Sequence, residues 1–306
     1  MIEENFQLVL SKFRLNSEPS SIKQWGEGHI HDTYLVESFD HQPDYILQKI
    51  NHKIFHDIPG MMKNIEIVTH HIREKIKTLP GHDPVRESVN LIRTETGLAY
   101  CMDDEGNYWR MYVFIPETVT WQKMPHPFVS YEAGKAIGFF QSMLTDLATP
   151  LLTTIPDFHN INLRIQQFEN AKQSDPESRI DKACIEIDFA QSRFECMKSY
   201  FEDLDRKAVI RATHNDTKLN NVLFDRENKA LCLIDLDTVM PGYVHFDYGD
   251  ALRTMANTAL EDEKDLSKVH FNLDVYEQFT RGYLEVAVDF LTETEKELLP
   301  YAPIYL

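Results

Sequence analysis

The sequence predicts an α+β fold with two lobes: a small antiparallel sheet with one helix in residues 1–115, and a larger, mostly helical lobe in residues 116–306. Short extended runs rich in β-branched and aromatic residues, such as 44–50 and 108–115, dominate the first lobe. Beyond Pro116, apolar residues recur at the three- and four-residue spacings of helices. A length of 306 residues with 42% hydrophobic content is sufficient for two such lobes.

Charge and composition exclude several classes of function. The chain has 49 acidic and 31 basic residues and a formal net charge of −18, so its surface repels nucleic-acid backbones. No apolar run approaches the roughly 20 residues of a membrane span, and the first residues, MIEENFQLVL, lack signal-peptide features. Four widely separated cysteines are typical of reduced thiols. We therefore expect a cytoplasmic monomer or weak homodimer without nucleic-acid or membrane partners.

The elements of the first lobe follow from these patterns. In order, we expect a helix in 1–14, two strands about a glycine turn in 22–37, a strand in 44–50, a helix in 60–79, and strands in 88–94, 98–102 and 108–115. The first helix places Phe6, Leu10 and Phe13 on one face. The second helix has apolar residues at spacings of three and four, from Met61 to Leu79.

The second lobe begins after a hinge predicted at 114–117. Ser130 is expected to cap a helix whose apolar face runs from Ala133 to Leu147. The remaining expected elements are a loop and helix in 155–168, a helix in 182–204, a hairpin of strands 221–224 and 230–236, a helix from 246, and two or three further helices. The apolar run LLPYAPIYL at Leu306 leaves open a further segment.

A polar loop before the hairpin carries groups that could handle a metal ion and a proton. Its spacing is His214-x-Asp216-x-Lys218-x-x-Asn221, and Asp235 follows at the end of the second strand. Phosphoryl transfer needs such groups, because the protein mainly positions the nucleophile and neutralises phosphate charge with Mg²⁺. The spacing resembles the catalytic loop and metal-binding Asp of the protein-kinase-like phosphotransferases, which implies that Asp216 orients the acceptor hydroxyl and takes its proton, while Lys218 reaches the γ-phosphate. Asn221 and Asp235 would hold Mg²⁺.

Two other residues of this region are expected to support the loop rather than to react. His214 would fix it by hydrogen bonds, and Asp247 would brace it through backbone hydrogen bonds. The simpler alternative is that these Asp and Asn residues only cap turns.

The first lobe offers candidate contacts to the nucleotide phosphates. The turn Gly26-x-Gly28 would allow the backbone to approach a phosphate closely. Lys49 is the single basic residue of its strand and stands where a phosphotransferase needs a lysine for the α- and β-phosphates. Glu66, in the following helix, is the nearest acidic candidate to pair with it. The alternative is a solvated strand lysine.

Taken together, these motifs resemble the aminoglycoside phosphotransferase and choline kinase superfamily, small-molecule kinases with the protein-kinase-like fold. The resemblance runs from LQKIN at 47–51 to FDYGDALR at 246–253. It implies a transferase that uses ATP and Mg²⁺, with Asp216 as the catalytic base and Asn221 and Asp235 as metal ligands. It also implies that adenine contacts the backbone of the hinge at Phe114 and Ile115. The choice of ATP over another nucleoside triphosphate stays open.

Within that superfamily, HNDTKLNNVLFD, IDLDTVMPG and FDYGDALR are most similar to the N-acetylhexosamine 1-kinases of carbohydrate metabolism, which phosphorylate the anomeric hydroxyl. Asn215 and Asp237 depart from the protein-kinase pattern, and no Ala-Pro-Glu sequence is present, which argues against protein substrates. Asp32, Asp237 and Arg253 are candidate acceptor-binding residues. They suit a sugar and a cationic alcohol equally, since a cation would need acidic or aromatic surroundings.

Three alternatives remain from the sequence. The first is a kinase for another small alcohol or amino sugar, such as choline, homoserine or an aminoglycoside. The second is a nucleotide-binding pseudokinase, although Lys49 and the residues of the polar loop are all present. The third is a metal-dependent phosphohydrolase, suggested by His31-Asp32 and His70-His71, but the first pair follows a glycine turn between strands rather than lying on a helix.

Overall fold

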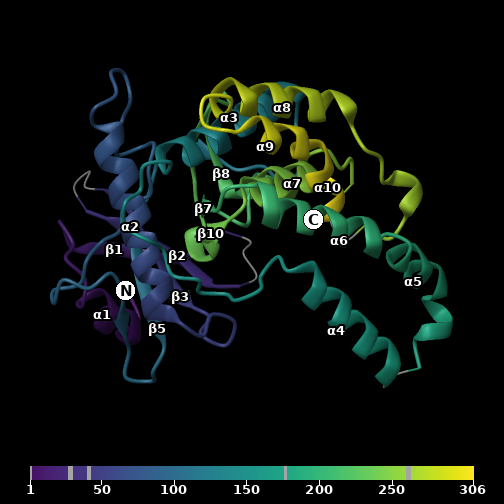
Figure 1. Ribbon diagram of the computed structural model, residues 1–306. Coiled ribbons are helices and arrows are strands. Elements are labelled where there is room, and N and C mark those ends of the chain that lie inside the picture. The colour runs from purple at the N-terminus through teal and green to yellow at the C-terminus, as the bar shows by residue number, and fades with distance from the viewer. Residues whose placement is uncertain (1, 27–29, 40–42, 176–177, 260–262) are drawn as a thin grey trace.

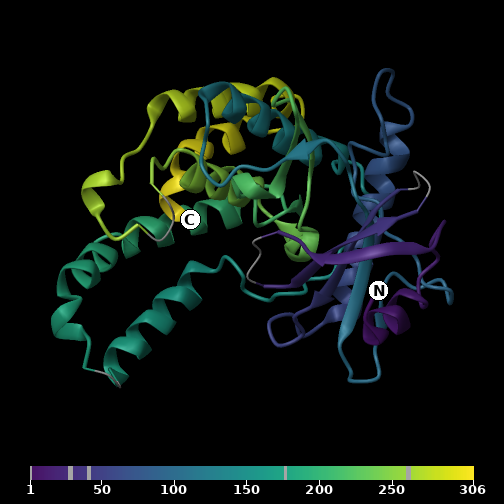
Figure 2. The same cartoon turned by 180° about the vertical axis from the view of Figure 1, so that it is seen from behind.

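The computed structural model describes residues 2–26, 30–39, 43–175, 178–259 and 263–306. Gly28 lies outside the described residues. A sheet with α2 (Ile58–Ile76) along it forms one lobe, and helices dominate the other (Figure 1). Seen from behind, α4 (Ile161–Ser174) and α5 (Cys184–Gln191) extend away from the rest of the helical lobe (Figure 2).

The sheet lobe has five strands in the order β1-β2-β3-β5-β4, with every neighbouring pair antiparallel. Its other elements with α2 are α1 (Glu4–Leu10), β1 (Pro19–Gln24), β2 (Asp32–Ser38), β3 (Tyr45–Ile50), β4 (Cys101–Met102) and β5 (Tyr108–Val113). Asp57 caps α2 by accepting a hydrogen bond from the backbone N–H of Gly60 at 2.9 Å. The two central strands carry the apolar core of the lobe.

The register of this sheet decides which side chains face the helical lobe. Lys49 on β3 lies opposite Asp32 on β2 and opposite Trp109 on β5, so these three residues share one face of the sheet. Trp109 packs into the apolar cluster that includes the buried residues of α1. Gln48 and Arg110 lie opposite each other on the other face, where Arg110 contacts α2 and the helical lobe.

The expected strand in 88–94 was wrong. Leu91 and Thr94 make only isolated bridges to Tyr112 and Phe13. The Asn90 amide donates to two nearby backbone carbonyls, those of residues 85 and 88, which favours a local turn over a ladder. The expected strand 98–102 is likewise reduced to β4.

The helical lobe contains most of the buried core and two small sheets, of order β6-β8-β9 and β10-β7. Its elements besides α4 and α5 are β6 (Thr118–Val119), α3 (Pro127–Met143), η1 (Ile180–Lys182), α6 (Phe194–Lys207), β7 (Arg211–Thr213), η2 (Leu219–Asn221), β8 (Val222–Asp225), β9 (Ala230–Leu233), η3 (Leu236–Thr238), β10 (Met240–Gly242), α7 (Val244–Met255), η4 (Leu266–Lys268), α8 (Leu273–Ala287), α9 (Glu293–Leu298), η5 (Leu299–Tyr301) and α10 (Ala302–Tyr305). Across the described ranges, no helix combines the length and apolarity that a membrane crossing requires.

Close contact of α3 and α8 forms the centre of this lobe and depends on glycine. A Cβ atom at Gly134 would meet the backbone oxygen of Phe279, and one at Gly282 would meet the backbone of Tyr131. A Cβ at Gly138 would lie 2.9 Å from another backbone oxygen of α8. The absence of side chains at these three positions therefore lets the two helix backbones approach each other.

The N-terminus of α3 differs from the expectation. His126 caps the helix, because its Nδ1 atom accepts a hydrogen bond from the N–H of Phe128 at 3.1 Å. Ser130 lies inside the first turn and donates instead to the carbonyl oxygens of Pro127 and Val275. Its hydroxyl thus joins α3 to α8.

The helix expected in 182–204 is two helices, α5 and α6. The side chains of Ser192 and Arg193 both donate to the carbonyl oxygen of Phe189 at 2.8 Å. These two bonds satisfy a backbone carbonyl of the last turn of α5 at the point where the helix ends. The short strands β7 and β10 were not predicted, since three residues are too few for a periodic signal.

Candidate active site

The polar loop that follows β7, residues 214–221, ends in η2 and is held in place by Asp247 of α7. The Asp247 carboxylate accepts hydrogen bonds from the backbone N–H groups of His214 at 3.1 Å and Asn215 at 2.7 Å. Gln141 of α3 adds a third donor at 2.8 Å. Because Asp247 is fully buried, this carboxylate fixes the start of the loop to the helical core.

A second segment, residues 234–238, follows β9 and is bonded to the first. The His214 Nε2 atom donates to the Ile234 carbonyl at 2.9 Å, and the Thr238 hydroxyl donates to the His214 carbonyl at 2.6 Å. The Asn215 amide donates to the Thr238 carbonyl at 3.0 Å. We call residues 214–221 the catalytic loop, after the base expected there, and residues 234–238 the metal loop, after the expected ligand Asp235. These hydrogen bonds join the two segments.

Three of the expected site residues meet in the catalytic loop. The Asn221 amide nitrogen donates to the backbone oxygen of Asp216 at 2.9 Å and to its carboxylate at 3.2 Å. Lys218 Nζ lies 3.4 Å from the other carboxylate oxygen of Asp216. The Asp216 side chain remains 23% exposed, so it can still receive a ligand.

Asp235 brings a second carboxylate to the same edge. The N–H of Ile234 donates to the Asn221 carbonyl at 2.9 Å, which places Asp235 beside the catalytic loop. The Asp235 carboxylate reaches solvent, but protein atoms crowd it, and this desolvation together with the charge of Asp237 raises its pKa. The side-chain hydrogen bonds of Asn221 use its amide nitrogen, so its amide oxygen is available to bind a metal ion. Oxygen donors from Asn221 and Asp235 fit the ligand preference of Mg²⁺.

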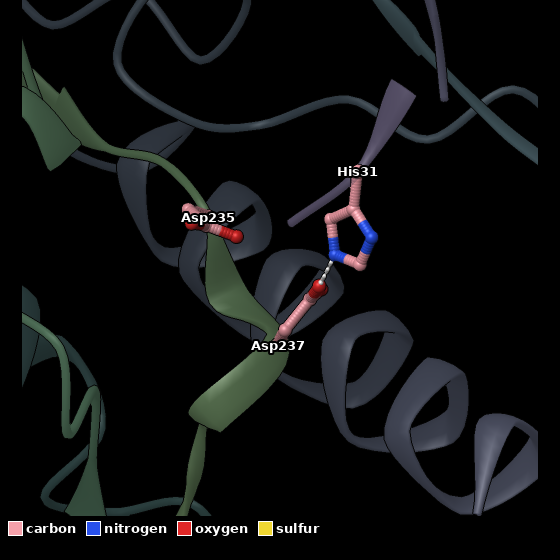
Figure 3. Close-up of side chains that lie close together, drawn as sticks. All are labelled: His31, Asp235 and Asp237. Atoms are coloured by element: carbon pink, nitrogen blue, oxygen red, sulfur yellow. Dashed lines mark hydrogen bonds and ion pairs between the residues drawn. The ribbon is translucent and has the colours of Figure 1, made fainter. Parts of the chain in front are cut away.

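Asp237, two residues after Asp235, is fully buried and bonded to two basic side chains. Figure 3 shows the His31 ring directed at its carboxylate, and ligand atoms of His31, Asp235 and Asp237 lie within 4.8 Å of one another. The Arg110 guanidinium binds both Asp237 oxygens. Although burial opposes ionisation, the contacts with Arg110 and His31 hold the pKa of Asp237 well below its usual range. Its expected role in binding the acceptor therefore does not fit, because its carboxylate is already occupied.

A further carboxylate, Asp250 of α7, lies near Asp216 and was not predicted as a site residue. One of its oxygens binds Arg253 Nη2 at 2.8 Å, and the other is buried without a hydrogen-bond partner among the described residues. Burial, reinforced by the charge of Asp216, raises the pKa of Asp250. Asp250 stands three residues after Asp247 on the same helix, a spacing that would have placed it beside the loop.

Residues 21–283 match the sequence profile of the Phosphotransferase enzyme family. The chain belongs to this family. It is therefore a phosphotransferase, and the catalytic and metal loops lie within the matched residues.

Solved structures of small-molecule kinases share the fold of this phosphotransferase. A microcompartment-associated aminopropanol kinase matches with a TM-score of 0.64 at 13% identity, covering 97% of this chain and 84% of the other. An ethanolamine kinase from Plasmodium vivax matches at 0.57 and 12% identity, covering 93% and 73%. Spectinomycin phosphotransferase, solved with ADP and spectinomycin, matches at 0.52 and 14% identity, covering 99% and 87%. The protein-kinase-like fold expected from the sequence is thus confirmed.

The structure does not bring Lys49 to the site of this phosphotransferase. Lys49 Nζ lies 5.8 Å from the centre of the Trp109 ring, on the sheet face that packs against α1. Asp32, opposite Lys49, shares that face. Glu66 binds Arg93 at 2.5 Å rather than Lys49. Alternation of side chains along a strand is the reason. A shift of one position exchanges the two faces, and Gln48 instead shares the face of Arg110, which contacts the helical lobe.

The hinge and the glycine turn lie at opposite ends of the strands. Val113, just before the hinge, pairs with Tyr45 at the start of β3, whereas the turn joins the end of β1 to the start of β2, where Asp32 pairs with Lys49. Phe114 donates its N–H to the Asp44 carbonyl at 2.8 Å, and its ring packs edge-on against Trp25 at 5.6 Å between centroids. Gly26 has a φ of 78°, a left-handed conformation that favours glycine. The Trp25 ring therefore reaches from the start of the turn to the hinge, while Gly28 is not described.

Proposed function

We propose that this phosphotransferase transfers the γ-phosphate of ATP to the anomeric hydroxyl of an N-acetylhexosamine and releases a sugar 1-phosphate. The observation that carries the proposal is the contact of Asp216 with both Lys218 and Asn221, at the edge formed with Asp235. A partly exposed carboxylate, a cation and metal-binding oxygens are thereby collected at one point, as phosphoryl transfer requires.

Each residue has a separate task in this reaction. Asp216 receives the hydrogen bond of the acceptor hydroxyl and takes its proton as the oxygen attacks phosphorus. Asn221 holds the Asp216 carboxylate in position, and Lys218 lies near enough to stabilise negative charge on the transferred group. When bound by Asn221 and Asp235, Mg²⁺ would neutralise charge on the nucleotide phosphates.

The choice of ATP rests on the hinge and on the solved relatives. Adenine would contact the backbone at Phe114 and Ile115, beside the ring of Trp25. ADP is present in the spectinomycin phosphotransferase structure, which supports an adenine nucleotide here.

The side chains around Asp250 support an acceptor rich in hydrogen-bonding groups. Asp216 is paired with Lys218, and Asp250 is paired with Arg253, so two acids and two bases lie together on the acceptor side. Donors and acceptors of hydrogen bonds are therefore both at hand for the hydroxyl and amide groups of a sugar. The free oxygen of Asp250 can accept a hydrogen bond from a sugar hydroxyl or amide.

An amino alcohol is the second candidate acceptor. Two of the solved relatives are named as kinases of aminopropanol and ethanolamine, which carry an amine as well as a hydroxyl. The same free oxygen of Asp250 would then bind an ammonium group. The hydrogen bonds that hold Asp216, Asn221 and the segment of Asp235 together support an active kinase over a pseudokinase.

The protein is further proposed to act in the cytoplasm, as a monomer or weak homodimer. All four cysteines are free thiols, and Cys184 and Cys196 are exposed, which suits a reducing compartment.

A panel of acceptors tests the proposal. ATP consumption with Mg²⁺ is measured with N-acetylglucosamine, N-acetylgalactosamine, glucose, choline, ethanolamine, aminopropanol, homoserine and kanamycin, and phosphorus NMR identifies the product. We expect turnover with an N-acetylhexosamine and the signal of a sugar 1-phosphate. Turnover with a cationic alcohol alone would replace the sugar by the second candidate. Nucleotide binding without turnover of any acceptor would favour the pseudokinase.

A further inference from the structure

Asp237 is a carboxylate of the helical lobe whose partners come from the sheet lobe. Arg110 of β5 binds it with both terminal nitrogens, and Nη2 lies 3.0 Å from Oδ2. His31, which precedes β2, binds the same carboxylate through Nε2. The side chains of Arg110 and Asp237 are only 1% and 3% exposed. These three residues, which we call the lobe anchor, therefore join the metal loop to the sheet.

Both partners of Asp237 are themselves held in place. The Arg110 Nε atom donates to the Gln48 side chain at 2.9 Å. The His31 Nδ1 atom accepts a hydrogen bond from the backbone N–H of Asn51 at 3.0 Å. Since Nδ1 is an acceptor, Nε2 carries the ring hydrogen and donates it to Asp237. The lobe anchor is therefore fixed by strands on the sheet side.

A metal ion on Asp237 is the obvious alternative, because His31, Asp235 and Asp237 form a compact group of possible ligands. However, both Asp237 oxygens are already bonded to Arg110 and His31. A divalent cation on this carboxylate would also lie against the Arg110 guanidinium, and the two charges would repel each other. Asp235 is the carboxylate of the metal loop that remains free for a ligand.

We propose that the lobe anchor fixes the direction of Asp235, and that Arg110, Asp237 and His31 are positioning residues for the metal site. This inference rests on the proposed role of Asp235 as a metal ligand. Asp235 has a φ of 61°, a left-handed conformation that costs energy for a residue with a Cβ atom and needs support from its surroundings. The bond from His214 to Ile234 supports one side, and the lobe anchor supports the other.

The lobe anchor also takes the place of a link found in protein kinases. There, a strand lysine pairs with a glutamate of the small-lobe helix to couple that lobe to the phosphates. Lys49 lies on the opposite face of the sheet, and Glu66 pairs with Arg93. Arg110, on the next strand and on the face that contacts the helical lobe, provides the buried cation that links the sheet to the metal loop.

Four variants of the full-length protein test this proposal: Arg110→Met, Asp237→Asn, the double variant, and Asp235→Asn for comparison. Thermal unfolding is measured without metal or nucleotide, and KM for MgATP is measured by turnover. Each single anchor variant should lower Tm by about 5 °C or more without metal, because it leaves a buried charge unpaired. Each should also raise KM for MgATP about tenfold or more, and the double variant should lose less than the product of the single losses.

Asp235→Asn should behave differently, with no fall in metal-free Tm but loss of Mg²⁺-dependent ATP binding. If Asp237→Asn instead kept the metal-free Tm and lost only the Mg²⁺ dependence, Asp237 would be a metal ligand and the proposal would be overturned. A lower Tm with unchanged KM and kcat would also overturn it, since the anchor would then be structural only. Should Arg110→Met not fold, Arg110→Lys replaces it. Its charge can still pair with Asp237 while the bidentate contact is lost, so a smaller fall in Tm but the same rise in KM for MgATP is expected.

The same variants separate this proposal from the proposed function. Retained Mg²⁺ dependence in Asp235→Asn would remove Asp235 from the metal site and overturn the proposed function together with the positioning role. The metal-free Tm of the anchor variants would still report on the joint between the lobes.

Discussion

At the scale of single residues, one oxygen of Asp250 is buried and has no hydrogen-bond partner within the described part of the chain. Buried polar atoms in folded proteins almost always have a hydrogen-bond partner, so a carboxylate oxygen without one marks a place that a substrate atom could fill. Arg253 orients the other oxygen at 2.8 Å. The position of Asp250 near Asp216 would put that substrate atom next to the reacting hydroxyl.

Asp250→Asn should therefore weaken acceptor binding. Loss of one charge-assisted hydrogen bond is worth about 2 kcal/mol, so KM for the acceptor should rise by about thirtyfold while KM for MgATP stays close to the wild-type value. Steady-state kinetics with each substrate varied in turn measure this. Asp203→Asn, a surface change on α6, serves as the matched control. An equal rise of both KM values would contradict a role on the acceptor side.

His159 gives the stability of the catalytic loop a dependence on pH. Its Nε2 atom donates to the Asn215 carbonyl at 3.2 Å, and burial lowers its pKa from 6.5 to about 4. Below pH 6.5 the imidazole of His159 becomes protonated in the unfolded chain, whereas in the folded protein it stays neutral until about pH 4. The free energy of unfolding should therefore fall by about 2 kcal/mol between about pH 7.5 and pH 5 through this residue alone.

Urea unfolding of the wild type and of His159→Gln at these two pH values measures the effect. The variant keeps a side-chain donor but cannot titrate, so its loss of stability on acidification should be smaller by that amount. Equal losses for the two proteins would show that His159 does not control the acid sensitivity.

At the scale of elements, the local patterns of the sequence predicted the strand runs and the amphipathic helices but not which elements pair. The spacing of the catalytic loop correctly predicted that Asp216 and Asn221 would lie together, because five residues of loop hold them near each other. The face of Lys49 was not predictable, because it depends on register with two other strands. The role of Arg110 was not predictable either, because its partner Asp237 lies 127 positions away in the sequence.

The packing of α3 against α8 is testable at this scale. Gly282→Ala would push a methyl group into the backbone of Tyr131, and this overpacking should cost about 2 kcal/mol of unfolding free energy. Denaturant unfolding measures the change. Glu277→Ala, an exposed change on the same helix, should be close to neutral. A neutral Gly282→Ala would mean that the two helices can separate without loss, against the close packing described here.

At the scale of the whole molecule, the proposed reaction draws on both lobes. The helical lobe would supply Asp216, Asn221 and Asp235, and the sheet lobe would supply the hinge, the glycine turn and two residues of the lobe anchor, Arg110 and His31. Buried contacts through Asp237 are the physical link between the lobes at the metal loop. This link joins residues that are far apart in the chain, so no local pattern in the sequence could have predicted it.

The central claim is that Asp216 is the base of a kinase reaction at this site. The measurement that tests it most directly compares Asp216→Asn with the wild type for MgATP binding and for turnover with the best acceptor of the panel. Nucleotide affinity should stay within about threefold of the wild type, while kcat should fall about a thousandfold, since the variant cannot take the proton. Unchanged turnover in Asp216→Asn would contradict the assignment and place the chemistry elsewhere.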